Sequence, residues 1–428
     1  MNSFASRYDD DLRAFVERLV SFDSITGDEA PIQGFVREHL DELGFETYEW
    51  TADADRLAAH PSFPDDPGAI DVTDRPSVGG VLELGDPDAG PTLVFNGHVD
   101  VVPAEGEWSS DPFAPSWDGD RLTARGAADM KSGLAACVYA ARALADEVEE
   151  GGENGEDAGD VNGRLVVDAV AGEEEGGIGA AAAALDNPYP FERDAAIVAE
   201  PTRLRPVVAT EGSLMVRLHV EGRSAHAASS WRGESVLPHF ESVRRALVDF
   251  EAERAERVTH PLYEDFPVPW PVVVGTVRAG RWASTVPAEL DAEVRVGVAP
   301  GETVDDVEAE LRDRLETLAE DDPWLADHLR LERFSVQFEA SEIDPDEPIV
   351  GAVVAAMERE GLSDAEPTGV TYGADARHYV EAGIPAVLFG PGTVEQAHFP
   401  DETIDWSEVL TAGAVLKRAA ETYLSRSA

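Results

Sequence analysis

Residues 92–100 read TLVFNGHVD, an apolar run that ends in two side chains able to bind a metal ion. The run Thr92–Phe95 is typical of a buried strand. On extended backbone, side chains two positions apart point to the same side, so His98 and Asp100 should face a common partner. A carboxylate beside an imidazole can fix the tautomer that a metal ligand needs. Alone, this pattern is more typical of an ordinary polar loop than of a metal site.

Four further segments place acids or a histidine beside predicted strands and helices. They are residues 125–133 (RGAADMKSG), 171–177 (AGEEEGG), 199–202 (AEPT) and 396–402 (QAHFPDE). Open α/β sheets place their sites at strand ends, where these segments concentrate. The five segments together contain two histidines and eight acids, enough to supply two histidines and three carboxylates as ligands with a Glu and an Asp to spare. Such a set of nitrogen and oxygen donors suits a hydrolase that uses two metal ions.

Each segment also has an ordinary structural explanation. Asp129 could cap the alanine-rich helix predicted over Ser132–Ala145. The glutamates at 173–175 could form a solvated turn in so acidic a chain, although their mutual repulsion makes a cation a natural neutraliser. A lone histidine such as His398 is more often a surface or core residue than a ligand. The combination of five segments in this order favours the metal site over these alternatives.

Short apolar runs alternate with helical patterns along most of the chain. Further strands are predicted at Arg164–Val170, Asp194–Ala199 and Ile384–Phe389. This alternation predicts an α/β fold with a mixed, mostly parallel sheet and helices on both faces. From residue 208 to residue 338 the pattern changes to that of a separate α+β module. We therefore expect a catalytic domain of residues 1–207 and 339–428, with a lid and dimerisation domain of residues 208–338 inserted into it.

Two stretches are predicted to be irregular. Residues 51–80 are rich in Asp, Pro and Ala and break the alternation of strands and helices. Residues 147–163, EVEEGGENGEDAGDVNG, are acidic and glycine-rich and have nothing to bury, so we expect a solvated loop there.

In order and wording, the motifs resemble those of one enzyme family. The segments are GHVDVVP, RGAADMKSG, GEEEGG, AEPT and AHFPDE. They resemble the acetylornithine deacetylase, succinyl-diaminopimelate desuccinylase and glutamate carboxypeptidase family of zinc peptidases, from about Leu12 to the last helix. The resemblance implies a zinc-peptidase-like catalytic domain and two divalent ions per subunit, with zinc the first choice and cobalt or manganese the alternatives.

The resemblance also implies a role for each ligand-type residue. His98 and Glu200 would bind one metal ion, Glu174 and His398 the other, and Asp129 would bridge the two. The reaction implied is hydrolysis of the amide of an N-acyl amino acid or a related N-acyl amine. A di- or tripeptide peptidase of the same family is the alternative, and a metal-binding protein without catalysis is a third hypothesis.

Three residues outside the ligand set carry predicted catalytic roles. Asp100 would orient His98, and Glu173 would act as the general base that takes a proton from water. His226, in the segment GRSAH, matches the family histidine that contacts the substrate carbonyl. In that family the histidine reaches the neighbouring subunit of a homodimer, so we expect a homodimer here.

Substrate contacts are predicted at Arg377, Ser284 and Arg295. A guanidinium such as that of Arg377 can bind a substrate carboxylate with two hydrogen bonds, although a surface ion pair is the ordinary alternative. Ser284 stands where much of the family has Asn, and Arg295 follows Pro287 at a shorter spacing than usual. A glutamate rather than an aspartate at position 200 resembles the deacylase and carboxypeptidase branches of the family more than its aminopeptidase branches. The lid and the 51–80 stretch resemble uncharacterised deacylases and formylaminopyrimidine deformylases.

Composition indicates the setting in which the chain works. There are 86 acidic against 33 basic residues, for a formal net charge of −53, and 43% of residues are hydrophobic. The sequence has no stripe of basic residues that could bind nucleic acid, so we expect no nucleic-acid partner. No apolar stretch approaches the length of a membrane span. A single cysteine, Cys137, fits a reducing cytoplasm. An acidic surface with only two lysines, Lys131 and Lys417, resembles proteins of halophiles.

We predict that folding depends strongly on salt. With a net charge of −53, the acidic side chains repel one another in dilute buffer. At molar salt the Debye length falls to about 3 Å, so this repulsion is largely screened. Dilution should therefore unfold the chain well below molar salt, and added divalent metal should partly rescue the active-site domain. Thermal melts over a salt series test this, and a Tm that stays flat from low to molar salt would contradict it.

Overall fold

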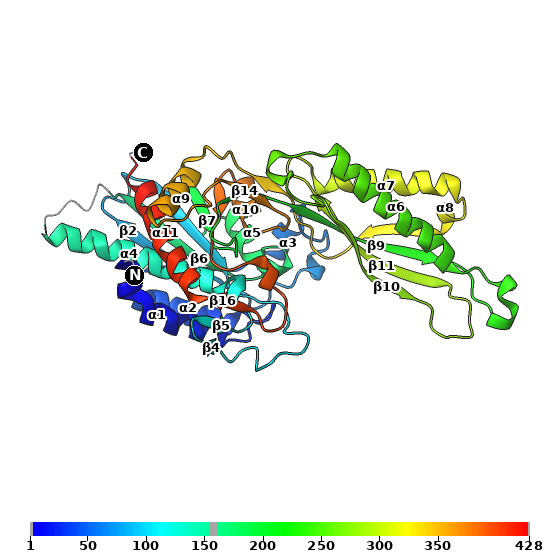
Figure 1. Cartoon of the computed structure of the whole chain (residues 1–428), viewed down its shortest axis with the longest axis horizontal. Coiled ribbons are helices and arrows are strands. Elements are labelled where there is room, and N and C mark those ends of the chain that lie inside the picture. Colours follow the sequence, from blue (N-terminus) through cyan, green and yellow to red (C-terminus); the bar gives the residue numbers. More distant parts are fainter. Residues whose placement is uncertain (1–2, 155–160, 427–428) are drawn as a thin grey trace.

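The computed structural model describes residues 3–154 and 161–426. Figure 1 shows a large body that contains both ends of the chain, and an elongated module that extends from one side of it. The large body holds one extensive sheet between helices, and the module holds a smaller sheet covered by two long helices.

The sheet of the large body has nine strands and is parallel in its centre. In spatial order the strands are β1 (Glu46–Trp50), β2 (Ser77–Leu84), β6 (Gly163–Val170), β3 (Thr92–His98), β7 (Ala195–Val198), β15 (Ala386–Leu388), β8 (Val207–Thr210) and β13 (Ser341–Glu342), with β14 (Thr368–Val370) paired to β8. Strands β6, β3, β7 and β15 run parallel, and the outer pairings of β1, β2, β8 and β13 are antiparallel. The central strands are buried throughout because helices cover both faces, which explains their continuous apolar runs.

Helices pack on both faces of this sheet, as the alternation predicts. One face carries α1 (Ser3–Val20), α2 (Ala30–Glu42), α4 (Ser132–Asn154), α9 (Pro348–Arg359) and α11 (Trp406–Leu424). The other carries α5 (Ile178–Leu185) and α10 (Ala376–Glu381), and α3 (Ala54–Leu57) packs against α5. A small sheet of β4 (Ser116–Asp118), β5 (Arg121–Thr123) and β16 (Thr403–Asp405) lies beside them. Within the described residues, no helix combines the length and apolar character needed to cross a membrane. The predicted α/β fold is confirmed.

The elongated module has a hydrophobic core of its own. Its antiparallel sheet has the order β10 (Val272–Ala279), β11 (Glu289–Val298), β9 (Gly212–Glu221) and β12 (Leu329–Arg333). Alternate side chains of β9 and β11 are buried against α6 (Val236–Arg257) and α7 (Val304–Asp321), and the short α8 (Leu325–His328) adds Leu325 to this core. Strand β8 pairs within the large sheet and continues to Thr210, so the large sheet extends past residue 207.

The two stretches predicted to be irregular differ in outcome. Residues 147–154 continue helix α4 instead of forming a loop, residues 155–160 lie outside the described residues, and β6 begins at Gly163. Ion pairs of Arg142 with Glu149 and of Lys417 with Glu147 offset part of the acidic repulsion along that helix. Residues 51–76 contain the short helix α3, a 3₁₀ turn at Pro67–Ala69 and irregular segments, and Leu57, Phe63 and Ile70 pack them onto α5. The prediction was wrong for residues 77–80, which belong to the buried strand β2.

Candidate metal centre

Three neighbouring parallel strands end at one edge of the large sheet and deliver most of the predicted ligands. His98 is the last residue of β3, Glu173 and Glu174 follow the end of β6, and Glu200 follows the end of β7. Because β3 lies between β6 and β7 and is parallel to both, these side chains emerge side by side. Strand ends predicted from sequence therefore converge as open α/β sheets require.

Two groups of possible ligand atoms share Asp129. His98, Asp129 and Glu200 form one group, and Asp129, Glu174 and His398 form the other, with the ligand atoms of each group within 4.8 Å of one another. The His98 Nε2 atom lies 3.2 Å from Asp129 Oδ1, and His398 Nε2 lies 3.1 Å from Glu174 Oε1. Two imidazoles and three carboxylates, one of them common to both groups, match the donors that two adjacent divalent ions take.

Electrostatic crowding at this edge also fits cations. Glu173 and Glu200 are both buried, with exposed fractions of 7% and 5%. Burial, and next the charge of Glu200, raises the pKa of Glu173 well above its usual range. Burial, and next the charge of Asp129, does the same to the pKa of Glu200. The carboxylates thus oppose one another's ionisation, and positive charge between them would relieve this.

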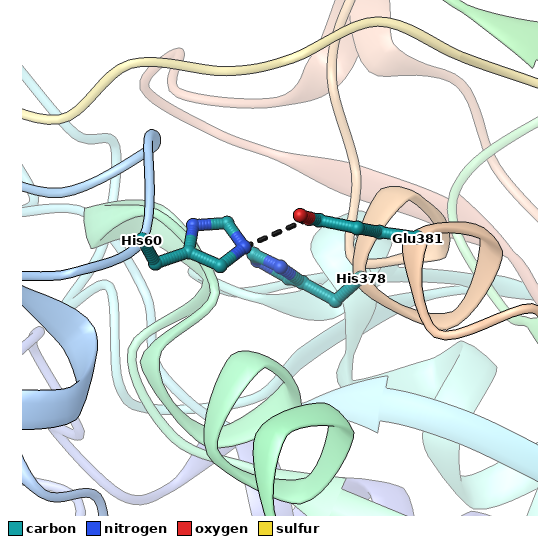
Figure 2. A group of neighbouring side chains, drawn as sticks. All are labelled: His60, His378 and Glu381. Carbon is teal, nitrogen blue, oxygen red and sulfur yellow. Dashed lines mark hydrogen bonds and ion pairs between the residues drawn. The ribbon is translucent and has the colours of Figure 1, made fainter.

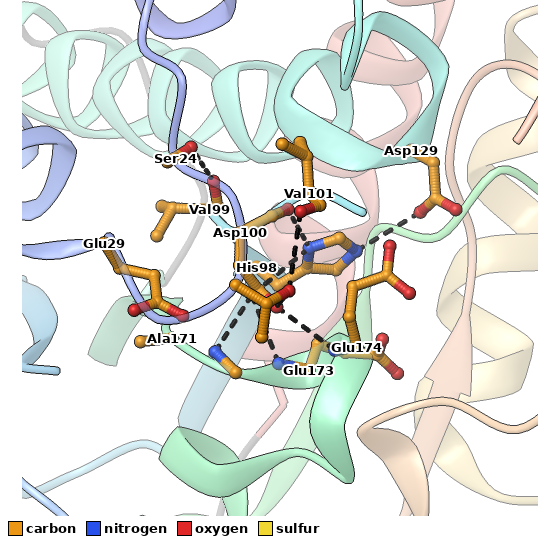
Figure 3. A network of polar contacts seen from close by, with 12 residues as sticks. Ser24, Glu29, His98, Val99, Asp100, Val101, Asp129, Ala171, Glu173 and Glu174 are labelled. Atoms are coloured by element: carbon orange, nitrogen blue, oxygen red, sulfur yellow. Dashed lines mark hydrogen bonds and ion pairs between the residues drawn. The ribbon is translucent and has the colours of Figure 1, made fainter. Parts of the chain in front are cut away.

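Asp100 connects His98 to the turn that carries the two glutamates (Figure 3). His98 Nδ1 lies 2.9 Å from the backbone oxygen of Asp100 and 3.6 Å from its carboxylate Oδ1. The carboxylate itself accepts the backbone N–H groups of Gly172, Glu173 and Glu174 at 3.0–3.2 Å. Asp100 therefore touches the imidazole mainly through its main chain, and its side chain holds the turn Glu173–Glu175 in place.

Glu402 holds the loop that carries Asp129. Its buried carboxylate accepts the N–H groups of Gly126, Ala128 and Asp129 at 2.8–3.1 Å, and it pairs with Arg125 at 2.8 Å. The sequence analysis assigns no role to Glu402. Its place in the segment 396–402, beside His398, was the one signal that could have pointed to this contact.

His226 and Ser284 do not join the metal centre within one chain. His226 is exposed, and its Nδ1 atom accepts the N–H of Ala228. Ser284 is exposed on the neighbouring loop, where Thr285 forms a β-bridge with His226. Both loops lie at the outer end of the elongated module, away from the large sheet (Figure 1).

The two arginines predicted to bind substrate lie in different surroundings. Arg295 lines a cleft of about 290 Å³ together with the metal-centre residues, and its Nη1 atom is 2.9 Å from Glu211 Oε1. Arg377 is only 3% exposed. Its guanidinium donates to the Gly176 oxygen at 2.6 Å and stacks 4.0 Å from the ring centre of Phe338. In this arrangement Arg377 supports the end of the glutamate turn and does not line the cleft.

A third group of possible ligand atoms, not predicted from sequence, consists of His60, His378 and Glu381 (Figure 2). His60 Nδ1 accepts the N–H of Ser62, so its Nε2 carries the proton and donates to Glu381 at 2.8 Å. His378 Nε2 donates to the Gly176 oxygen at 3.0 Å. These hydrogen bonds already use the ring nitrogen through which His60 would bind a metal ion. The group therefore joins the segment around His60 to α10.

Comparison with known proteins gives a consistent picture. A family model described as "Peptidase family M20/M25/M40" matches residues 94–422. The chain is 26% identical over 403 residues to the N-formyl-4-amino-5-aminomethyl-2-methylpyrimidine deformylase of Bacillus subtilis (strain 168), covering 89% of this chain and 86% of that protein. It is 26% identical over 336 residues to the acetylornithine deacetylase of Edwardsiella ictaluri (strain 93-146), covering 78% and 81%. The fold is similar to that of the di-peptidase Dug1p from Saccharomyces cerevisiae, with a TM-score of 0.74, 14% identity and coverage of 99% and 98%.

The raised pKa of Glu173 predicts how stability depends on pH in metal-free protein. Below the ordinary glutamate pKa of about 4.3, this carboxyl is protonated in the folded and unfolded chains alike and has no effect. As pH rises past that value, the unfolded chain ionises first, so the free energy of unfolding falls. Glu173→Gln mimics the protonated form and should raise the Tm of chelator-treated protein at about pH 8, by a margin that closes toward pH 4.3.

Melts at molar salt with and without zinc check this expectation. Zinc should shrink the margin because cations neutralise the ionised carboxylates. Glu49→Gln, at an exposed position on β1, is the matched control and should shift the Tm little at any pH. A margin for Glu173→Gln that does not vary with pH would contradict the account.

Proposed function

Because the chain belongs to peptidase family M20/M25/M40, we propose that it is a two-metal amidohydrolase that cleaves the amide of an N-acyl amino acid or a related N-acyl amine. The observation that carries the proposal is the pair of ligand groups that share Asp129, with Glu173 beside them and in neither group. The family resemblance drawn from the motifs is confirmed, and with it a metal-dependent hydrolase that acts on amide bonds.

Glu173 is the candidate for moving protons between the attacking water and the departing amine. Two divalent ions, with zinc as the first choice, would be held by five residues: His98, Asp129, Glu174, Glu200 and His398. Such ions would act as Lewis acids and would lower the pKa of a water molecule from 15.7 toward about 7. Glu173 lines the same cleft, so its carboxylate can accept the proton of the attacking water and deliver it to the departing amine. Asp100 helps to fix the position of Glu173 because its carboxylate accepts the backbone N–H of Glu173.

The remaining catalytic group, His226, would come from a second copy of the chain. Within one chain its loop lies at the outer end of the module, so His226 would reach a metal centre, as a donor to the developing oxyanion, from a partner chain. The outer strand β10 exposes Val273 and Val277, and the loop after it exposes Trp282, with exposed fractions of 49%, 49% and 74%. Apolar side chains on an edge strand suit an isologous interface, which supports a homodimer built through this lid module.

The relatives favour deacylation over peptide hydrolysis. Both curated relatives described above, a deformylase and a deacetylase, are named for removing a small acyl group. A dipeptidase is the second candidate, supported by the fold shared with the Saccharomyces cerevisiae protein. Arg295, which lines the cleft beside the acids, is the residue best placed to contact a substrate carboxylate.

A substrate panel separates the two candidates. N-acetyl amino acids, N-formyl amines and free dipeptides should be compared at molar salt with added zinc or cobalt. The proposal expects the highest kcat/KM on an N-acyl or N-formyl substrate. Hydrolysis of dipeptides alone would favour the second candidate, and metal binding without turnover of any substrate would exclude both.

Glu173→Gln should keep metal binding and lose most turnover. Gln cannot accept the proton of water, and a general base contributes about a hundred- to ten-thousand-fold to the rate. The measurement is kcat together with metal content per chain. Glu174→Gln is the matched comparison and should lower metal content instead. Full activity of Glu173→Gln would overturn the base assignment, and unchanged metal content in Glu174→Gln would mean that the two glutamates are misassigned.

Mixing two inactive variants tests whether His226 acts between subunits. His226→Ala should fold and bind metal normally while lowering kcat, since an oxyanion donor is worth about 2.7–4 kcal/mol. In a mixed dimer of His226→Ala with Glu173→Gln, one site has both wild-type residues, so partial activity should return. If subunits exchange and no activity returns, the histidine acts within its own chain or has no catalytic role.

A further inference from the structure

A second and larger cavity lies next to the metal-centre cleft. Its volume is about 450 Å³, against about 290 Å³ for the cleft, and the two share Pro201, Tyr372 and Val394. Pro201 directly follows Glu200, and Val394 lies four residues before His398. The wall that the two spaces share therefore lies close to the proposed metal ligands. A ligand bound at the metal centre therefore has the larger cavity beside it, across these three residues.

Apolar side chains form much of the wall of this cavity. Val207 of β8 is buried, whereas Leu262, Phe266 and Val370 are only half-buried. These residues come from the large sheet and from the connection between α6 and β10. Apolar surface left in contact with water inside a concave site is typical of a place where a ligand completes the burial.

Charged residues at the cavity balance one another. Arg203 pairs with Glu395, and Arg205 pairs with Asp364 at 3.3 Å. The lining includes Asp265 in addition to Glu395, so it carries two basic and two acidic side chains. In a chain with a net charge of −53, a cavity without net charge is unusual and does not favour a cationic ligand.

We propose that this cavity is a specificity subsite for an uncharged, apolar part of the substrate, an alkyl chain or an aromatic ring attached to the scissile amide. The proposal rests on the amide hydrolysis proposed above and names the substrate class more closely. Tyr372 and Val394 border both spaces, so a substrate that occupies the two spaces would contact both side chains. Each methylene buried there should improve kcat/KM by about fourfold.

The test compares substrates of increasing length in wild-type and variant enzyme. One series lengthens the acyl group from acetyl to hexanoyl on a fixed amino acid, and the other lengthens the amino-acid side chain under a fixed acetyl group. Wild-type kcat/KM should rise along one of the two series, which identifies the side of the amide that enters the cavity. Thr368→Phe, on β14 in the wall of the larger cavity only, should lower the ratio of long- to short-substrate kcat/KM at least tenfold.

Two further variants make the result decisive. Thr371→Phe fills the same cavity from the residue that follows β14, and it should also lower the ratio of long- to short-substrate kcat/KM. Thr47→Phe replaces another half-buried strand threonine, which lines neither cavity, and should keep the wild-type ratio. Each variant is first checked for a cooperative melt and for metal content equal to wild type.

The outcomes separate this proposal from the one on which it rests. Wild-type enzyme that gains nothing from length in either series would overturn the subsite while leaving amide hydrolysis intact, and this result needs no variant. A wild-type ratio in a folded Thr368→Phe or Thr371→Phe variant would also overturn it. Hydrolysis of N-formyl amines with no member of either series cleaved would overturn the subsite alone. If wild-type enzyme hydrolyses no member of either series and no N-formyl amine, the proposed function itself fails and the subsite with it.

Discussion

Repulsion among buried carboxylates is the constraint on which the rest of the site depends. Asp129, Glu173, Glu174 and Glu200 meet where three parallel strands end, and burial together with their neighbours' charges raises the pKa of each of the three glutamates. Asp129 is the exception: burial opposes its ionisation, but the hydrogen bond from His98 and the positive charges of His98, His398 and Arg125 together lower its pKa. The carboxylate shared by both ligand groups is thus the one most readily ionised, which suits a bridging ligand.

Two further buried acids keep this arrangement in place without joining either ligand group. Asp100 holds the backbone N–H groups of the turn Glu173–Glu175, and Glu402 holds those of the loop before Asp129. Each carboxylate accepts several main-chain hydrogen bonds, so each loop is fixed by its backbone while Asp129 and Glu174 contact the two histidines through their side chains. Residues that orient ligands in this way are as necessary to the geometry as the ligands themselves.

The sequence predicts which ligand-type side chains converge because their positions follow from local pattern. A strand can be recognised by its apolar run, and residues after parallel strands must share one edge of the sheet, as His98, Glu174 and Glu200 do. The contact of Arg377 with Gly176 could not be predicted, since it joins segments remote in sequence. For Glu402 only its place beside His398 gave a signal, and its backbone partners are equally remote. Local pattern likewise missed the continuation of α4, which depends partly on the ion pair between Glu147 and Lys417 of the last helix.

The central claim, that two cations share Asp129, is tested most directly by X-ray diffraction from zinc-loaded crystals grown at molar salt. Anomalous difference maps from data collected on both sides of the zinc absorption edge locate the ions without reference to activity. The account predicts two peaks about 3.5–4 Å apart, both within coordination distance of the Asp129 carboxylate. A single peak, or a pair that does not include Asp129 between them, would contradict it.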